Sequence, residues 1–317
     1  MRQGELVRLM LKSQYAEFSQ HKEERVCVLF NAMSDRRAQA YKSAPSRAGL
    51  LMESDECQVV VRRSLGVNLC NRTGALECKS CGGFLDLKGD HECPKDGAWV
   101  KAHNAVRDLF FDTARQGLVE CRKEQKVTFK PECADCHKVP SQEEKGNGHP
   151  CPKRATRKAT GAEKPSLGDD NRIITPTYTA DIVFEQGIPG LTVKRTLVDF
   201  TIKHEFLPTY RYEESQKLGS AALIGEKEKD SDYKERSEAI NHAFVPVALN
   251  SLGHLRPHGV DLAYHLIDQR AHHKGMTFEE SASLFWHKLS MTIHQAHARN
   301  ILTRFRDILY SMTVPRT

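Results

Sequence analysis

Two aspartates stand in segments whose composition favours extended strands. Asp181 lies in TADIVF and Asp199 lies in LVDFTIK. Alternate residues of a strand share a face, so Asp199, Thr201 and Lys203 are expected to point the same way. Carboxylates on neighbouring strands suit a hard cation such as Mg2+, which also accepts phosphate oxygens as ligands. Spacing alone leaves open the alternative of a solvent-facing aspartate on each of two edge strands.

A cluster of cysteines and a histidine indicates a second kind of chemistry. The cluster consists of Cys78, Cys81, His91 and Cys93. Thiolate and imidazole ligands close tetrahedrally around Zn2+, and four of them leave no open position, so the predicted ion is structural. Gly82 and Gly83 favour the tight turn that brings two sulfurs to one ion. Cys70 is an alternative ligand, and free buried cysteines beside a surface histidine are the alternative to a metal site.

A second cluster repeats this format within a long polar insert, residues 131–171. Its members are Cys133, Cys136, His149 and Cys151. His137 competes with His149 as the nitrogen ligand, and an insert without metal is the alternative. The insert lacks apolar periodicity and also holds the basic tract KRATRKATGAEK, so we expect a zinc-pinned and otherwise mobile loop.

The elements that position these groups follow from hydrophobic periodicity. Apolar residues from Ala102 to Leu118 recur at three- and four-residue steps and predict a helix that ends near Gly117. Strands are predicted over 119–129, 177–186, 194–204 and 244–253, the middle two joined by the turn GIPG. Residues 205–225 are predicted to be irregular. Further helices are predicted over 226–242, 259–273 and 278–312.

Capping and the N-terminal pattern complete this outline. The last helix is predicted to open with a capping box of Thr277 and Glu280. Residues 1–70 read as mainly helical. The predicted organisation is a helical N-terminal region 1–73, a zinc knuckle 74–97, a core 98–255 that contains the insert 131–171, and C-terminal helices 256–317.

Composition limits the class of protein. The 317 residues are 39% hydrophobic and 28% charged, as in ordinary globular proteins. No apolar run approaches the roughly 18 residues of a membrane helix, and MRQGELVRLMLK lacks a signal-peptide core. We therefore expect a nuclear or cytoplasmic protein without a membrane partner, in which ten cysteines serve zinc rather than disulfides. The net charge of +6 permits a polyanionic partner without requiring one.

Order and motifs together carry a resemblance to a known family. The expected α/β order, αβββαβ with a mixed sheet and acidic residues on the second and third strands, resembles the core of PD-(D/E)XK nucleases. More closely, about residues 35–255 are similar to the restriction-like endonuclease domain downstream of reverse transcriptase in non-LTR retrotransposons. The matching segments are CKSCGGFLDLKGDHEC, KAHNAVRDLFF, TADIVF with LVDFTIK, AFVPVALNSLG, and the lead-in QAYKSAPSRAGLLMESDECQVVVRRSLGVNLC.

The resemblance implies roles for several residues. Asp181 and Asp199 would hold a catalytic Mg2+, and His103 with Asn104 matches the family's His-Asn pair, with Arg107 one turn further on the helix. Without the family, a capping or core role would be the better interpretation of His103. The chain departs from the pattern in three ways: Ala180 replaces the usual proline, the insert is longer, and the gap between the histidine and cysteine ligands is shorter.

The catalytic lysine is not at its usual place, where Thr201 stands instead. The resemblance places it on the next helix, which indicates Lys229, with Lys227 beside it. Lys203 shares the face of Asp199 but lies about 13 Å further along the strand, at about 3.3 Å per residue. Lys217 is a further candidate, and a Lys/Glu run on a solvated helix face is the alternative interpretation.

Three functions remain open from the sequence. The first is a metal-dependent DNA endonuclease, with the zinc loop and the KRATRK tract on backbone phosphates and an RNA template as a further partner in a retroelement complex. The second is a catalytically inactive nucleic-acid-binding relic of the same fold. The third is a zinc-stabilised interaction module, which the long C-terminal helices would suit. Oligomeric state is left open.

Overall fold

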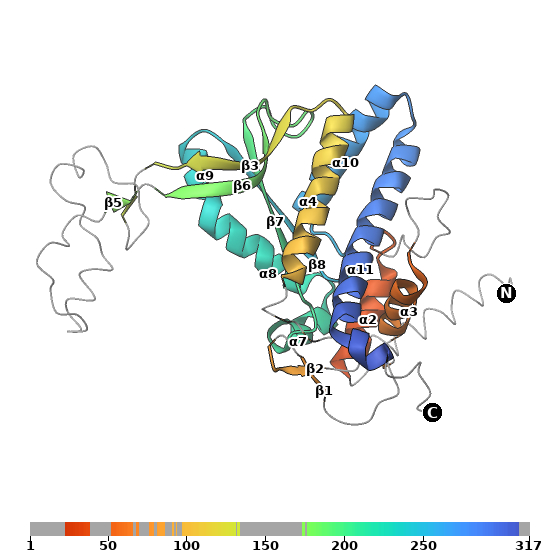
Figure 1. Cartoon of the computed structure of the whole chain (residues 1–317). Helices are drawn as coiled ribbons and strands as arrows, with labels where there is room; N and C mark the ends of the chain where they lie inside the picture. Colours follow the sequence, from red (N-terminus) through yellow and green to blue (C-terminus); the bar gives the residue numbers. More distant parts are fainter. Residues whose placement is uncertain are drawn as a thin grey trace, which may run out of the picture.

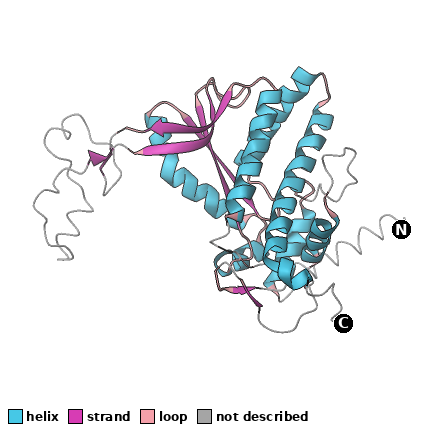
Figure 2. Ribbon diagram, viewed as in Figure 1, coloured by secondary structure: helices cyan, strands magenta, loops and turns pink. Residues whose placement is uncertain are grey.

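The structure is a computed structural model of the 317-residue chain. It describes residues 23–38, 52–65, 68–69, 76–78, 81–85, 91, 93, 97–130, 132–133, 173–174 and 176–310. Within these ranges the chain is a mixed α/β protein in which helices cover both faces of a four-stranded sheet (Figures 1 and 2).

The sheet has the order β3-β6-β7-β8. Its strands are β3 (Cys121–Thr128), β6 (Thr177–Phe184), β7 (Thr196–Lys203) and β8 (Ala243–Asn250). β3, β6 and β7 pair antiparallel, and β8 pairs parallel to β7. All four predicted strands are therefore confirmed. Because parallel neighbours need a long crossover, the segment between β7 and β8 must cross one face of the sheet.

Helices fill this crossover, so the prediction of irregular structure over 205–225 was wrong. They are α7 (Pro208–Gln216), α8 (Ser220–Lys229), a π turn η3 (Asp230–Lys234) and α9 (Glu235–Ala239). Tertiary contacts stabilise this polar segment. Buried Glu214 accepts the backbone N–H groups of Gly219 and Ala221 at 2.7 and 2.8 Å, and the Asn250 side chain at 3.0 Å. The helix predicted over 226–242 is the end of α8 followed by η3 and α9.

Three long helices cover the opposite face: α4 (Ala98–Gln116), α10 (Pro257–Lys274) and α11 (Phe278–Tyr310). The main core lies between them and the sheet, where Phe110 of α4 packs edge-on against Phe200 of β7 and Phe285 of α11. The predicted capping box is confirmed by reciprocal bonds between Thr277 and Glu280 of 2.9 and 3.1 Å. The C-terminal helices are thus part of the main core rather than an extension of it.

The smaller elements α2, α3, β1 and β2 lie at one end of these helices, whereas β5 lies apart, on the far side of the sheet (Figure 1). α2 (Glu24–Ser34) and α3 (Ser54–Ser64) supply the described helical part of residues 1–70, and α3 packs on the C-terminal half of α11. The short strands β1 (Leu76–Glu77) and β2 (Phe84–Leu85) form a hairpin, and β4 (Glu132–Cys133) pairs with β5 (Ile173–Ile174). Within the described ranges, no helix combines the length and apolar character that a membrane crossing requires.

Candidate functional site

Asp181 and Asp199 converge where β6 and β7 separate. The paired residues of the two strands extend to Ile182 and Val198, and the aspartates are the next residue on each strand. Their carboxyl groups lie close enough for each to shift the pKa of the other. The backbone N–H of Phe200 donates to Oδ2 of Asp181 at 2.7 Å, which fixes that carboxylate at the point of separation. Two strands thus deliver two carboxyl groups to one place.

Burial and mutual repulsion separate the pKa values of this pair. The side chains of Asp181 and Asp199 are only 13% and 8% exposed. Burial raises the pKa of Asp199, and the charge of Asp181 adds to this effect, so that together they outweigh the lowering by Lys229. Burial would also raise the pKa of Asp181, but His103 and the N–H of Phe200 hold it below its ordinary value. A cation between the two groups would relieve their repulsion.

Lys229 is the lysine that reaches this pair. It is the last residue of α8, and its Nζ lies 2.5 Å from Oδ2 of Asp199. Burial would lower the pKa of Lys229, but Asp199 raises it overall, so the ammonium stays charged. Lys203 instead pairs with Glu228 at 2.5 Å, while Lys217 and Lys227 are exposed.

A glycine permits the close approach of α8. A Cβ on Gly225 would lie 2.9 Å from Cγ2 of Thr201 and 2.9 Å from Cε of Lys203. These distances are shorter than real Cβ contacts, so α8 can approach β7 this closely only because residue 225 is a glycine. Gly225 is four residues, about one helical turn, before Lys229 and so sets the reach of that lysine.

His103 approaches Asp181 from α4. Its Nε2 lies 3.1 Å from Oδ2 of Asp181 and 3.1 Å from the carbonyl oxygen of Phe200, so this nitrogen faces two acceptors and carries a proton. Its Nδ1 lies 3.2 Å from Oδ1 of Asn104. Burial would lower the pKa of His103, but the bond to Asp181 raises it overall. His103 is therefore a hydrogen-bonded partner of Asp181, with its pKa shifted toward the charged form, rather than a capping or purely core histidine.

Tyr178 is a member of this site that the sequence did not indicate. Its buried phenol faces Asp199, and burial together with the charge of Asp199 raises the pKa of Tyr178. The ring stacks on Tyr233 with a centroid separation of 4.1 Å. Tyr233 lies in the π turn that directly follows Lys229, and such turns are frequent at functional sites. A tyrosine in a strand is ordinary, so no sequence signal marked it.

The first Cys/His cluster comes together as predicted. One ligand atom each from Cys78, Cys81, His91 and Cys93 lies within 4.8 Å of all the others. A tetrahedral ion with bonds of about 2.3 Å places its ligands about 3.8 Å apart, so this group could hold a metal such as zinc. The six cysteines whose side chains are described form no disulfide with one another.

Two glycines shape the turn of this knuckle. Gly82 has φ +73°, a conformation that favours glycine. A Cβ on Gly83 would lie 3.1 Å from Cε1 of His91 and 3.3 Å from Sγ of Cys81, so a side chain would press on two ligands. Arg304 of α11 donates to the carbonyl of His91, which ties the knuckle to the helical layer.

The second Cys/His cluster lies outside the described residues. Of its members, only the backbone of Cys133, in β4, is described. Cys136, His149 and Cys151, together with the competing His137, the alternative ligand Cys70 and the basic tract, are not described. Zinc binding by the insert therefore stays a prediction.

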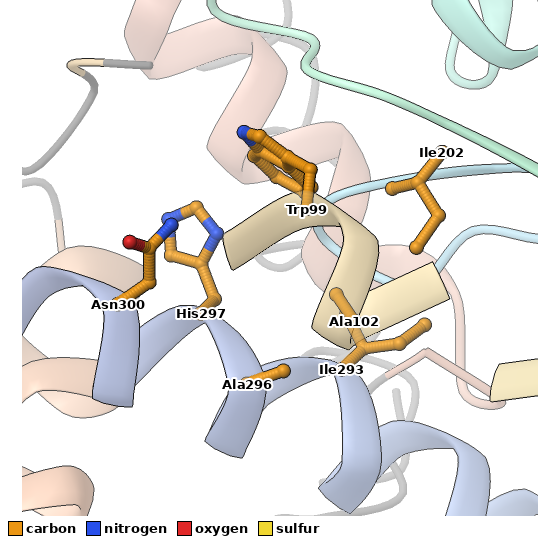
Figure 3. A pocket seen from close by; sticks show the side chains of 7 residues that line it. All are labelled: Trp99, Ala102, Ile202, Ile293, Ala296, His297 and Asn300. Carbon is orange, nitrogen blue, oxygen red and sulfur yellow. The ribbon is translucent and has the colours of Figure 1, made fainter. Parts of the chain in front are cut away.

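Two hollows are described beside α4, and neither is lined by Asp181 or Asp199. One cavity of about 10 Å³ lies between α4 and α11 and has room for about one water molecule (Figure 3). Its lining is mostly apolar, with Trp99, His297 and Asn300 as the polar members. An open groove of about 350 Å³ runs along the same two helices, between Lys101 and Arg299.

Comparison with known proteins supplies no relative: no family model matches the chain, and no curated protein or solved structure matches it.

Proposed function

We propose that this protein is a Mg2+-dependent DNA endonuclease of the PD-(D/E)XK type, related to the reverse-transcriptase-associated nucleases of non-LTR retrotransposons. The observation that carries the proposal is the meeting of three groups from three elements. Asp181 of β6 and Asp199 of β7 follow directly on the last pair of their strands, and Lys229 of α8 lies 2.5 Å from Asp199. Two carboxylates with an adjacent lysine are the groups that metal-assisted phosphodiester hydrolysis requires.

The order of the elements adds support. α4, three antiparallel strands, a helical crossover and a parallel fourth strand follow one another along the chain, as the resemblance predicts. The acidic residues lie on the second and third of these strands. His103 and Asn104 lie on α4, the helix to which the resemblance assigns the His-Asn pair, and His103 contacts Asp181 of the second strand.

The donor set of the pair fits a hard divalent cation. Both donors are carboxylate oxygens. Burial and, to a smaller extent, their repulsion raise the pKa of Asp199, and a bound cation would relieve the repulsion. When bound there, Mg2+ would supply a Lewis acid for a phosphate oxygen and a lowered pKa for a water molecule.

The surrounding residues then have distinct roles. His103 donates from Nε2 to Asp181 and, with the N–H of Phe200, orients this carboxylate. Lys229 is protonated, so it cannot act as a base; its charge would stabilise the negative charge that develops on the phosphate. The buried Tyr178 phenol borders Asp199, whose charge adds to burial in raising the pKa of the phenol. The zinc knuckle is assigned a structural role because its four ligands close the site.

A plasmid assay with the full chain tests the proposal. The parent protein should convert supercoiled plasmid to nicked circles with Mg2+ and should not do so with EDTA. DNA binding with a steep salt dependence and no cleavage would instead support the inactive relic, an alternative that Ala180 and Thr201 favour through their departure from the family pattern. The interaction-module alternative has less support, because α10 and α11 pack on the sheet.

A further inference from the structure

Sheet pairing is interrupted on both sides of Asp181. Toward β7, the last paired residue of β6 is Ile182, and its neighbour Asp181 is unpaired. Toward β3, the register pairs Lys123 with Ile182 and Gln125 with Ala180, but it passes over Glu124, which stands opposite Asp181. Pairing with β3 resumes at Ala180 and continues to Thr177, whereas pairing with β7 does not resume. Asp181 therefore stands at a local break on the β3 side, at the point where β6 leaves β7.

Glu124 has an unusual backbone at this point. Its φ is +54°, in the left-handed region, which is strained for a residue with a Cβ. Such a conformation inside a strand persists only when surrounding contacts hold it, and strained residues of this kind cluster at functional sites. Glu124 is otherwise an exposed residue of an edge strand. Something beyond local preference must hold it.

Arg107 of α4 is the group that holds Glu124. Its Nη1 donates to the Glu124 carboxylate, and its side chain is only 8% exposed. Its Nε donates to Asp108 at 3.1 Å, and Lys123 donates to the same Asp108 oxygen at 3.0 Å. Two cations and two carboxylates thus join α4 to β3 beside the interruption, which immobilises Arg107 better than a lone surface pair would.

α4 therefore reaches Asp181 by two routes one helical turn apart. His103 contacts the carboxylate directly. Arg107, four residues later, acts on the backbone of the strand that faces it. We propose that Arg107 and Glu124 are positioning residues for Asp181, and that their ion pair holds the break in the sheet that turns this carboxylate toward Asp199. This inference rests on the proposed function, because it concerns Asp181 as a metal ligand.

Binding of Mn2+ alone, measured by calorimetry on the full chain, tests the inference without cleavage. Glu124→Val favours the extended backbone, and Arg107→Met removes the anchor while keeping the apolar stem. We expect each to weaken Mn2+ binding about tenfold or more, as loss of outer-shell partners does at other metal sites. Glu124→Gly, which accepts a positive φ without a Cβ, should lose less than about threefold.

Arg122→Met is the matched control, because it removes the Arg122–Glu185 pair of 3.5 Å from the same strand without touching the interruption. Thermal unfolding of each variant shows that the protein is folded. Unchanged Mn2+ affinity in folded Glu124→Val and Arg107→Met would overturn the inference while leaving the proposed function intact. If the parent itself binds no Mn2+, or Asp181→Asn binds as tightly as the parent, both are overturned.

Discussion

Lys229 lies 2.5 Å from Asp199, although Lys229 is at the far end of α8, 30 positions later in the chain, and the whole of α7 lies between them. The lysine thus comes from α8, which crosses one face of the sheet. Position 201 of the strand that carries Asp199 is a threonine, so that strand does not supply the lysine there. Because the two groups come from different elements, the contribution of Lys229 to cleavage can be tested by substituting Lys229 alone.

Lys229→Met should lower the rate of Mg2+-dependent DNA cleavage by about a hundredfold or more, because it removes the positive charge beside the reacting phosphate. DNA binding should change little, since one lysine among many carries a small share of the phosphate contacts. Lys227→Met is the control: it lies two residues away on an exposed surface and should cleave as the parent does. Equal loss in both variants would contradict the assigned role.

Gly225→Ala should slow cleavage by about tenfold or more, because the new Cβ would meet Thr201 Cγ2 at 2.9 Å and push α8, with Lys229, off β7. The gain in helix propensity, about 1 kcal/mol, should not appear as a rise in unfolding free energy. Adding Thr201→Ser removes the opposing methyl group and should restore part of the rate. A more stable, fully active Gly225→Ala protein would show that the approach of α8 is not limiting.

His103→Gln should reduce stability in a pH-dependent way. Burial would lower the pKa of His103, but Asp181 raises it above 6.5, so its contribution is complete below pH 6.5 and is lost as the pH rises through the folded pKa. The pKa of Asp181 is lowered from 3.8, so its own contribution is present above that pH and lost as the pH falls. The stability difference should thus be largest between pH 3.8 and 6.5.

Urea unfolding of parent and His103→Gln with EDTA, across this range and up to about pH 9, measures the difference. His258→Gln is the control: His258 also faces a carboxylate, that of Glu226 at 3.2 Å, but its side chain is 53% exposed, so solvent screens the pair. A stability difference that grows toward alkaline pH would reverse the expected sign and would contradict a charged His103 beside Asp181.

Cys78→Ser should release one equivalent of zinc relative to the parent and lower the midpoint of thermal unfolding. The cluster joins β1 and β2 to α11 through Arg304, so its loss should loosen this end of the molecule. Cys57→Ser changes an exposed cysteine outside the cluster and should retain the metal content of the parent. Identical zinc content in the two variants, by metal analysis, would exclude this site.

The strands and their aspartates could be predicted because they depend on local composition. TADIVF and LVDFTIK favour strands, and GIPG favours the turn between them, so the pairing that brings Asp181 near Asp199 follows from neighbours in the chain. The spacing of the first Cys/His cluster likewise predicted its convergence. Lys229 was indicated by the resemblance to a family and not by its own surroundings, which read as a solvated helix face.

The remaining features depend on contacts between distant residues. α7 was missed because its polar sequence is stabilised by Glu214, whose partners lie in the following turn and in β8. The left-handed backbone of Glu124 leaves no mark in an ordinary strand sequence, since it depends on Arg107 of another element. The same holds for Tyr178, which only the folded sheet places beside Asp199.

The joint action of the two carboxylates is tested most directly by the nicking of supercoiled plasmid by Asp181→Asn and Asp199→Asn proteins. The variants are compared with the parent at equal DNA occupancy, and circular dichroism verifies that they are folded. Each variant is expected to lose at least about a hundredfold in the Mg2+-dependent rate while still binding DNA. Nicking by both variants at the rate of the parent would contradict a metal-dependent cleavage site built on this pair.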